Sequence, residues 1–481
     1  MIGPTPAAQI PQKQIPQKEK TPVAPKPVML VRPPLGILLE DGFWDEMEDA
    51  GIDEVAIQWL ALLDDQGGEQ TRYPQIEDTH PRGLAAVGGK PVQRTPVAAY
   101  APDHNLYEGL LFSPPDLPDN MVAESAKLKL ALQKATERGF GIWLMDDKGY
   151  FLFGGFGDGT QRKPMSCVND PDLAGYAVQR ARDTCSNFPG SAGLILDGPD
   201  FKWEIKPGHR DDMFVEECGC RHCVRVAESL GFGYERVLEG RDAFRTRLQS
   251  LSPEAVDDQL SNRAGLFGGL DWWLEEPATA DWMRYKATVI EQHVRAICDG
   301  IHEYMPNMKV ATSSRMPALA PMTGHVVRRK MAFNDIEMPK LYWWFGGVAG
   351  FRGTVANWID TLVDWNDDLS PDKALEWFSA VFDVPMPSDY PPSEYGEEAT
   401  DAWFDTTVDD QIRKMLAQTG GPERFMPWVG LEHFGSELVT PSELRRMLQR
   451  MEAQGVQHYA YFVYNSITPE IWSVITEFSR K

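Results

Sequence analysis

Three cysteines lie close together in the pattern Cys218-x-Cys220-x-x-Cys223. This spacing is too tight for an efficient set of mutual disulfides, but it suits convergence on one metal ion. Cys167 is the best candidate for a fourth ligand, because the loops that follow adjacent parallel strands lie side by side, and His222 is the substitute. Four thiolates leave no open coordination position, so the pattern predicts a structural zinc; reduced thiols without metal are the alternative.

Acidic residues follow two of the apolar segments. Gly193–Leu196 has the length and composition of a buried strand and leads directly into Asp197 and, after a turn, Asp200. Phe425–Leu431 leads in the same way into Glu432. Two carboxylates across a pocket are the groups that cleave a glycosidic bond, so Asp197 and Glu432 are the predicted catalytic pair. Alternatively, Asp197 is a turn residue, and Glu432 is an ion-pair partner or a ligand of a substrate hydroxyl.

The elements that carry these residues alternate between strand and helix. An α/β fold of the (β/α)8 TIM-barrel class is therefore expected, with the active site at the carboxyl ends of its strands. An open doubly wound sheet is the rival, but no glycine-rich phosphate loop follows the first strand. The expected strands are Leu35–Leu39, Ile52–Gln58, Gly141–Met145, Gly193–Leu196, Lys309–Thr312, Ile336–Trp344, Phe425–Leu431 and Gln457–Tyr464.

In such a barrel the residues at the strand ends form one ring. This ring is rich in carboxylates and aromatic side chains and contains no lysine, which argues against Schiff-base chemistry and favours sugar chemistry. The fourth and seventh strands face one another across the pore, so Asp197 and Glu432, which follow them, would lie on opposite sides of one site. The expected substrate-binding residues are Asp146, Asp200, Glu204, Arg315, Trp343, His433 and Tyr464.

The chain is predicted to form one large domain with a tail. Residues 1–27 are rich in proline and carry little to bury, which is typical of a disordered segment. Residues 28–481 are expected to form the barrel. Long insertions are predicted at about 60–120, 224–275 and 345–405, where glycine, proline and aspartate interrupt the alternation.

Composition narrows the classes of partner. The 481 residues carry 47 basic and 71 acidic side chains and a formal charge of −24, which disfavours nucleic acid and anionic membranes. The 15 Trp and 14 Tyr suit stacking on sugar rings, or alternatively fill a large core. Six cysteines are too few for a disulfide scaffold, and Cys185 and Cys298 are expected to be ordinary buried thiols.

The expected compartment is the cytoplasm. The sequence shows neither a signal segment nor an apolar run of about 18 residues. A secreted protein whose leader was removed is the alternative. The oligomeric state is left open, with a homo-oligomer as one option.

The cysteine motifs resemble the zinc site of family 42-type β-galactosidases and related hypothetical glycosyl hydrolases. Cys167-Val168-Asn169-Asp170 stands before a helix, and the sequence from Cys218 to Cys223 follows the fourth strand. The similarity continues in Asp281–Tyr285 and at Glu432. It implies a structural zinc, a carbohydrate substrate and a retaining exo-glycosidase with Glu432 as the nucleophile.

The fourth strand departs from that family. The β-galactosidases have Asn-Glu there, with the Glu as acid/base, whereas this chain has Asp197-Gly198-Pro199-Asp200. In the first hypothesis Asp197 or Asp200 acts as the acid of a retaining mechanism, and Asp197 is the predicted acid/base. A second hypothesis is that the LILDG segment resembles α-L-fucosidase-like barrels, in which this Asp is the nucleophile of an α-glycosidase. A third is a barrel that binds glycans without cleaving them.

Overall fold

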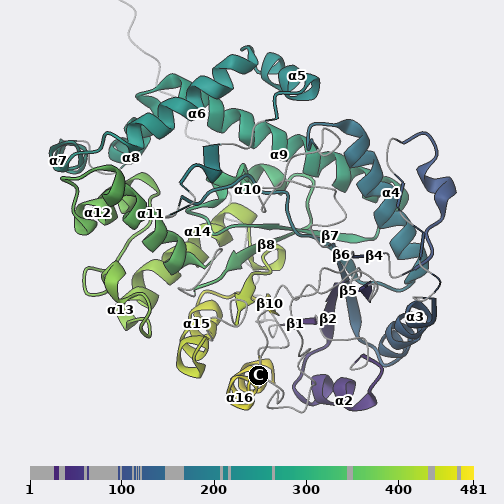
Figure 1. The fold of residues 1–481 in the computed structure, drawn as a ribbon. Coiled ribbons are helices and arrows are strands. Elements are labelled where there is room, and N and C mark those ends of the chain that lie inside the picture. The colour runs from purple at the N-terminus through teal and green to yellow at the C-terminus, as the bar shows by residue number, and fades with distance from the viewer. Residues whose placement is uncertain are drawn as a thin grey trace, which may run out of the picture.

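The computed structural model of the chain (Figure 1) describes most of the sequence. The described residues are 26–31, 38–58, 62–63, 96–97, 100–110, 113–114, 116–117, 119, 122–146, 167–205, 208, 210–214, 218–262, 266–343, 350–431, 439–462 and 467–480. The predicted tail at 1–25 and much of the insertion at 60–120 lie outside them.

Eight parallel strands close into a barrel, as the alternation of strands and helices predicted. Each strand pairs with the next along the chain, and the last, β10, pairs with the first, β1, so that the sheet has no open edge. The barrel strands are β1 (Lys26–Val31), β2 (Glu54–Gln58), β5 (Gly141–Asp146), β6 (Gly193–Leu196), β7 (Lys309–Ser314), β8 (Ile336–Leu341), β9 (Trp428–Gly430) and β10 (His458–Phe462).

The first strand lies earlier than the sequence predicted. Lys26–Val31 pairs with β2 on one side and β10 on the other, in the place predicted for Leu35–Leu39, of which residues 35–37 lie outside the described residues. Its apolar run is flanked by prolines, which made it look like the end of the tail. Because β1 begins at Lys26, two residues assigned to the tail, Lys26 and Pro27, belong to the barrel wall.

Helices surround the strands on the outside (Figure 1). They begin where the sequence supplies caps: Asp170 accepts a hydrogen bond from the Asp172 amide at the start of α4, and Thr440 and Glu443 form a capping box on α15. The helices longer than one turn are α2 (Asp41–Asp49), α3 (Val122–Glu137), α4 (Pro171–Asn187), α5 (Arg221–Ser229), α6 (Tyr234–Leu248), α7 (Pro253–Asn262), α8 (Leu266–Leu274), α9 (Pro277–Tyr304), α11 (Phe351–Trp365), α12 (Pro371–Val381), α14 (Asp409–Thr419), α15 (Pro441–Ala453) and α16 (Pro469–Ser479).

The insertion predicted at 224–275 is largely helical and forms α5 to α8, of which α6 packs along α9 (Figure 1). That packing is close, because a Cβ on Gly240 would lie 1.9 Å from the backbone oxygen of Ala278. The short helix α10 (Val327–Lys330) stands between β7 and β8. No helix in the described part of the chain is long and apolar enough to cross a membrane.

Tryptophan fills much of the core. Inside the barrel wall, a Cβ on Gly193 would lie 2.4 Å from the ring of Trp143, so glycine in β6 makes room for the indole. Core filling thus accounts for about half of the 15 tryptophans that composition had offered as sugar platforms. The fully buried tryptophans are Trp44, Trp143, Trp282, Trp358, Trp377, Trp403 and Trp428.

Candidate active site and metal centre

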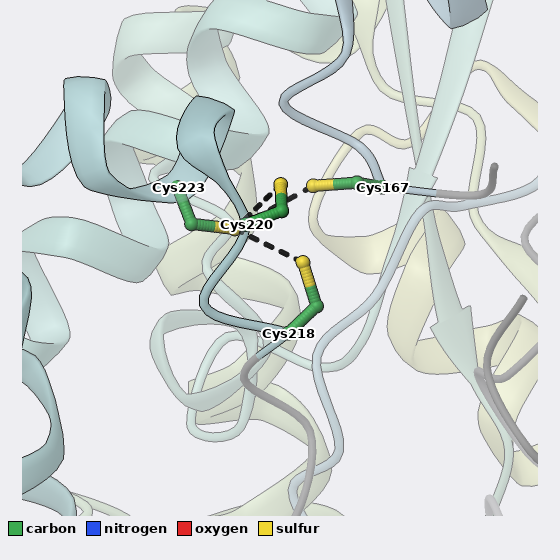
Figure 2. A group of neighbouring side chains, drawn as sticks. All are labelled: Cys167, Cys218, Cys220 and Cys223. Carbon is green, nitrogen blue, oxygen red and sulfur yellow. Dashed lines mark hydrogen bonds between the residues drawn. The ribbon is translucent and has the colours of Figure 1, made fainter. Parts of the chain in front are cut away.

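Four cysteine sulfurs converge between two loops of the barrel (Figure 2). Their Sγ atoms all lie within 4.8 Å of one another. Cys223 is the centre of the group, with its sulfur 3.3 Å from that of Cys218, 3.5 Å from that of Cys167 and 3.8 Å from that of Cys220. The prediction that Cys167 joins the other three is confirmed, and the cluster can hold a metal ion.

The ends of two helices position these sulfurs. Cys167 precedes the Asp170 cap of α4, and Cys220 caps α5, whose first turn contains Cys223. Between Cys218 and Cys220, Gly219 has a φ of +61°, and its amide donates to the Tyr234 hydroxyl at 3.1 Å. Glycine at this position allows the sharp turn that folds Cys218 back toward Cys223.

The thiols of the cluster differ in pKa. The hydrogen bonds from Cys167 and Cys218 hold the pKa of the Cys223 thiol far below its usual range, whereas the hydrogen bonds with Cys218 and Cys223 raise the pKa of Cys167. The side-chain amide of Asn169 also contacts the Cys223 sulfur at 3.4 Å and the Tyr285 hydroxyl on α9 at 3.2 Å. Among the thiols of the cluster, that of Cys223 is therefore the one whose thiolate form its neighbours favour.

The donor set fits a tetrahedral thiolate site. Sulfurs about 2.3 Å from a zinc ion stand ~3.8 Å apart, close to the separations seen here. His222, the substitute ligand, instead has its Nε2 3.9 Å from an oxygen of Asp170. Cys185 and Cys298 lie on helices away from the cluster, and burial raises the pKa of both, in Cys185 to about 12.

A second polar group lies at the carboxyl end of β6, inside the barrel. Asp197 follows the strand and is 7% exposed. Its Oδ1 accepts a hydrogen bond from the Ser313 hydroxyl at 2.8 Å and lies 2.5 Å from the Nζ of Lys340. Strands β6, β7 and β8 are adjacent, and each supplies one of these three side chains.

Asp200 is buried beside this group and has its own partners. Its Oδ2 lies 3.3 Å from Arg315, its Oδ1 lies 3.0 Å from the Nε2 of His325, and Lys340 is 4.0 Å away. Burial by itself would raise the pKa of Asp200, but Arg315, His325 and Lys340 together hold that pKa well below its usual range. The surroundings of Asp200 thus favour its carboxylate form.

Lys340 corrects the expectation that the ring contains no lysine. The residue lies within the apolar segment Ile336–Trp344, and a strand alternates its side chains between two faces. Glu337 points outward, where Lys330 of α10 contacts it at 2.9 Å, whereas Lys340 points to Asp197 inside the barrel. The signal that could have found Lys340 is its even spacing from Ile336 and Met338.

Aromatic side chains at the end of β8 divide in the same way. The ring of Trp343, a predicted substrate contact, packs against Phe351 and Trp403 in the helical layer. Its neighbour Tyr342 stacks on Phe462 of β10, with ring centroids 5.3 Å apart. This stacked pair is buried at the strand ends, and the sequence analysis did not identify it.

Two of the predicted substrate-binding residues lie on the far side of Asp200. Arg315 stacks over the ring of Trp203, 3.8 Å from its centroid. Glu204 is half-buried and accepts hydrogen bonds from Asn357 at 2.9 Å and Thr354 at 3.3 Å, both on α11. Trp203 and Glu204 are neighbours in the chain, so the segment that carries them contacts both Arg315 and α11.

The remaining predicted site residues are not described. Glu432, His433 and Tyr464 lie outside the described residues. The backbone of Asp146 ends β5 and pairs with Leu196, but its side chain lies outside the description. The described structure therefore brings Asp197, Asp200 and Arg315 together and leaves the position of Glu432 a prediction.

A buried histidine beside the cysteine cluster is expected to make the free energy of unfolding depend on pH. His293 of α9 is 3% exposed and hydrogen-bonds the backbone of Val168, next to Cys167, and burial lowers its pKa to about 4. As pH falls from about 6.5 toward 4, the unfolded chain takes up a proton that the folded chain does not, so stability falls by about 1.4 kcal/mol per unit.

We therefore expect His293→Gln to lose less of its free energy of unfolding than the wild type between pH 7 and pH 5. Urea unfolding at the two pH values measures the difference. Equal losses in the two proteins would show that His293 does not titrate in this way.

Comparisons with known proteins give only distant structural likenesses. No family model matches the sequence, and no curated protein matches it. Solved structures that it resembles include the PgaB (BpsB) glycoside hydrolase domain from Bordetella bronchiseptica, with 11% identity, a TM-score of 0.44 and coverage of 94% of this chain and 98% of that one.

Two further solved structures resemble the chain at similar sequence identity. A β-galactosidase from the psychrophilic Marinomonas ef1 has 9% identity and a TM-score of 0.47, and the match covers 95% of this chain and 59% of that one. The Group IV chitinase from Ostrinia furnacalis has 7% identity and a TM-score of 0.43, over 95% and 100% of the chains. At such identities the likeness concerns the chain trace, so the function must be argued from the residues.

Proposed function

We propose that this protein is a glycoside hydrolase, a retaining exo-glycosidase that acts on a carbohydrate. The observation that carries the proposal is Asp197, a carboxylate at the carboxyl end of β6 that faces the inside of the barrel and is fixed by Ser313 and Lys340. Barrel enzymes keep their catalytic groups at this face. Carboxylates are the groups that glycoside cleavage requires.

Glu432 is the proposed second carboxylate. It follows β9 by two residues, and β9 lies three strands from β6 around the barrel. Two divisions of labour fit a retaining mechanism: Glu432 as nucleophile with Asp197 as acid/base, or the reverse. Asp200 is not proposed as the proton donor, because its neighbours favour the carboxylate form, and its proposed role is to orient Arg315.

The substrate would extend along the side chains around this pair. Arg315 and Glu204 form one proposed side of the subsite, and the stacked pair of Tyr342 and Phe462 is proposed in addition to the predicted Trp343. The side chains of three more residues, which are not described, complete the proposal: Asp146, His433 and Tyr464.

The four cysteines are proposed to hold a structural zinc. Four sulfur ligands would leave no position for a water molecule or a substrate, so the ion would act by joining the β5–α4 loop to the segment before α5. Cys167, Cys218, Cys220 and Cys223 would bind it as thiolates. A cytoplasmic location and a homo-oligomer also stay predictions.

One observation favours a second candidate, a barrel that binds glycans without cleaving them. Asp197 and Asp200 are both less than 9% exposed, and both are ion-paired with buried cations. Pairs of this kind also occur where carboxylates only maintain structure. Kinetic measurements separate the two functions.

The deciding experiment measures hydrolysis of a panel of aryl α- and β-glycosides. We expect the wild type to cleave at least one of them, and Asp197→Asn and Glu432→Gln each to lower kcat by a factor of about 10³ or more. Asp368→Asn, which changes an exposed carboxylate, is the matched control and should retain full activity. Binding of oligosaccharides without any turnover would favour the glycan-binding barrel.

A further inference from the structure

We infer that Lys340 is a positioning residue that keeps Asp197 in its anionic form, and that Asp197 is therefore the nucleophile and not the proton donor of the glycosidase reaction. The inference rests on the proposed function and deepens it, because the proposed function leaves the roles of the two carboxylates open. It is carried by one contact, the 2.5 Å approach of the Lys340 Nζ to the Asp197 Oδ1.

The surroundings of this contact assign the lysine to Asp197. Lys340 is 5% exposed, so little water screens its charge. It lies 4.0 Å from Asp200, a much longer approach than its contact with Asp197. Asp200 has a cationic neighbour of its own in Arg315 and a hydrogen-bonding neighbour in His325, so Lys340 is not required to neutralise it.

Two neighbouring strands, β7 and β8, each supply a polar side chain that faces Asp197. Lys340 extends from β8, and Ser313 of β7 donates to the same carboxylate oxygen as the lysine approaches. An oxygen that already accepts from an ammonium and a hydroxyl would lose one of these partners if it carried a proton itself. An ammonium ion at this distance also stabilises the carboxylate relative to the acid.

With Asp197 as the nucleophile, the bonds that form and break in each step of the reaction are defined. An oxygen of the Asp197 carboxylate forms a bond to the anomeric carbon while the bond from that carbon to the leaving oxygen breaks. The leaving oxygen keeps the electron pair and takes the proton of the Glu432 carboxylic acid. Water then attacks the anomeric carbon and gives a proton to Glu432, and the electron pair of the breaking ester bond returns to Asp197.

The lysine can be tested without removing its hydrogen bond. Lys340→Gln keeps a donor beside Asp197 and loses only the charge. On a glycoside that the wild type cleaves, we expect kcat to fall at least tenfold, and the acidic limb of the kcat/KM profile to move up by about 1–3 pH units. Lys340→Arg, which restores the charge, should return that limb toward its wild-type position.

A matched control lies on the opposite face of the same strand. Lys330 and Glu337 form a buried ion pair at 2.9 Å in the helical layer. Lys330→Gln removes a buried ammonium in the same way, but it should leave the pH profile unchanged to within a few tenths of a unit. Circular dichroism and thermal unfolding of both variants establish that each is folded at the temperature of the assay.

A chemical test assigns the role of Asp197 without using Lys340. With Asp197→Gly, azide should restore turnover and yield a glycosyl azide of anomeric configuration opposite to that of the substrate, which marks a missing nucleophile. A glycosyl azide of retained configuration would make Asp197 the acid/base and overturn the inference.

An unchanged pH profile in folded Lys340→Gln would overturn the inference as well, while wild-type turnover would leave the proposed function intact. Absence of turnover by the wild type on every glycoside would contradict the proposed function itself, and with it the role given to Lys340.

Discussion

Replacing Cys223 by serine is expected to abolish metal binding and to destabilise the fold. Cys223 lies within 3.3–3.8 Å of the other three sulfurs and carries the lowered pKa, so its loss removes the central ligand of the cluster. The expected loss is on the order of 4 kcal/mol, the stabilisation by a metal present at a thousandfold its dissociation constant. Metal analysis of the purified protein and thermal unfolding measure the two effects.

Cys185 offers the matched control, since it lies on α4 outside the cluster. We expect Cys185→Ser to keep the metal content of the wild type, close to one equivalent of zinc. Less than half an equivalent in the wild type would refute the zinc proposal. So would full stability in Cys223→Ser.

Asp200→Asn is expected to lower the free energy of unfolding by about 3–5 kcal/mol, the cost of removing one partner from a buried ion pair. Arg315 is 5% exposed and would lose its carboxylate, so an uncompensated charge would remain in the core. Urea unfolding at neutral pH measures this loss. The neighbouring Asp197 keeps its own lysine, so that pair should survive the change.

The double variant Asp200→Asn with Arg315→Met provides the control, because it removes both charges. We expect it to be more stable than the sum of the two single changes predicts. The lowered pKa of Asp200 adds a signed test: its stabilising contribution is present above about pH 4 and is lost as pH falls through the lower pKa of the folded state. Strict additivity in the cycle would show that the two charges do not interact.

Much of the fold could be read from the sequence wherever local signals were strong. The bounds of β6 (Gly193–Leu196) agree with the prediction, because an uninterrupted apolar run marks the strand, and the helix expected after Asp170 begins there, because an Asp-Pro cap marks its start. The fourth cysteine was also predictable, since neighbouring strands of a barrel bring their loops together. The cap and the apolar run act over a few residues, whereas the fourth cysteine was predictable from the barrel topology.

The errors arose where a short segment has two interpretations. The apolar run of β1 is bounded by prolines, so it was assigned partly to the tail. Lys340 was overlooked because an apolar strand hides one charged residue that faces inward. Trp343 and Tyr342 are adjacent, and only the packing of β8 against β10 and α11 shows which ring faces which layer.

Strand β8 carries opposite charges on its two faces, Glu337 toward Lys330 and Lys340 toward Asp197. A slip of one residue in its pairing with β7 would turn the glutamate into the lumen, toward Asp197, and the lysine into the outer shell beside Lys330. Each ion would then meet its own sign, and both errors would cost free energy at once. The two ion pairs therefore favour the observed register of β8 over a register that is shifted by one residue.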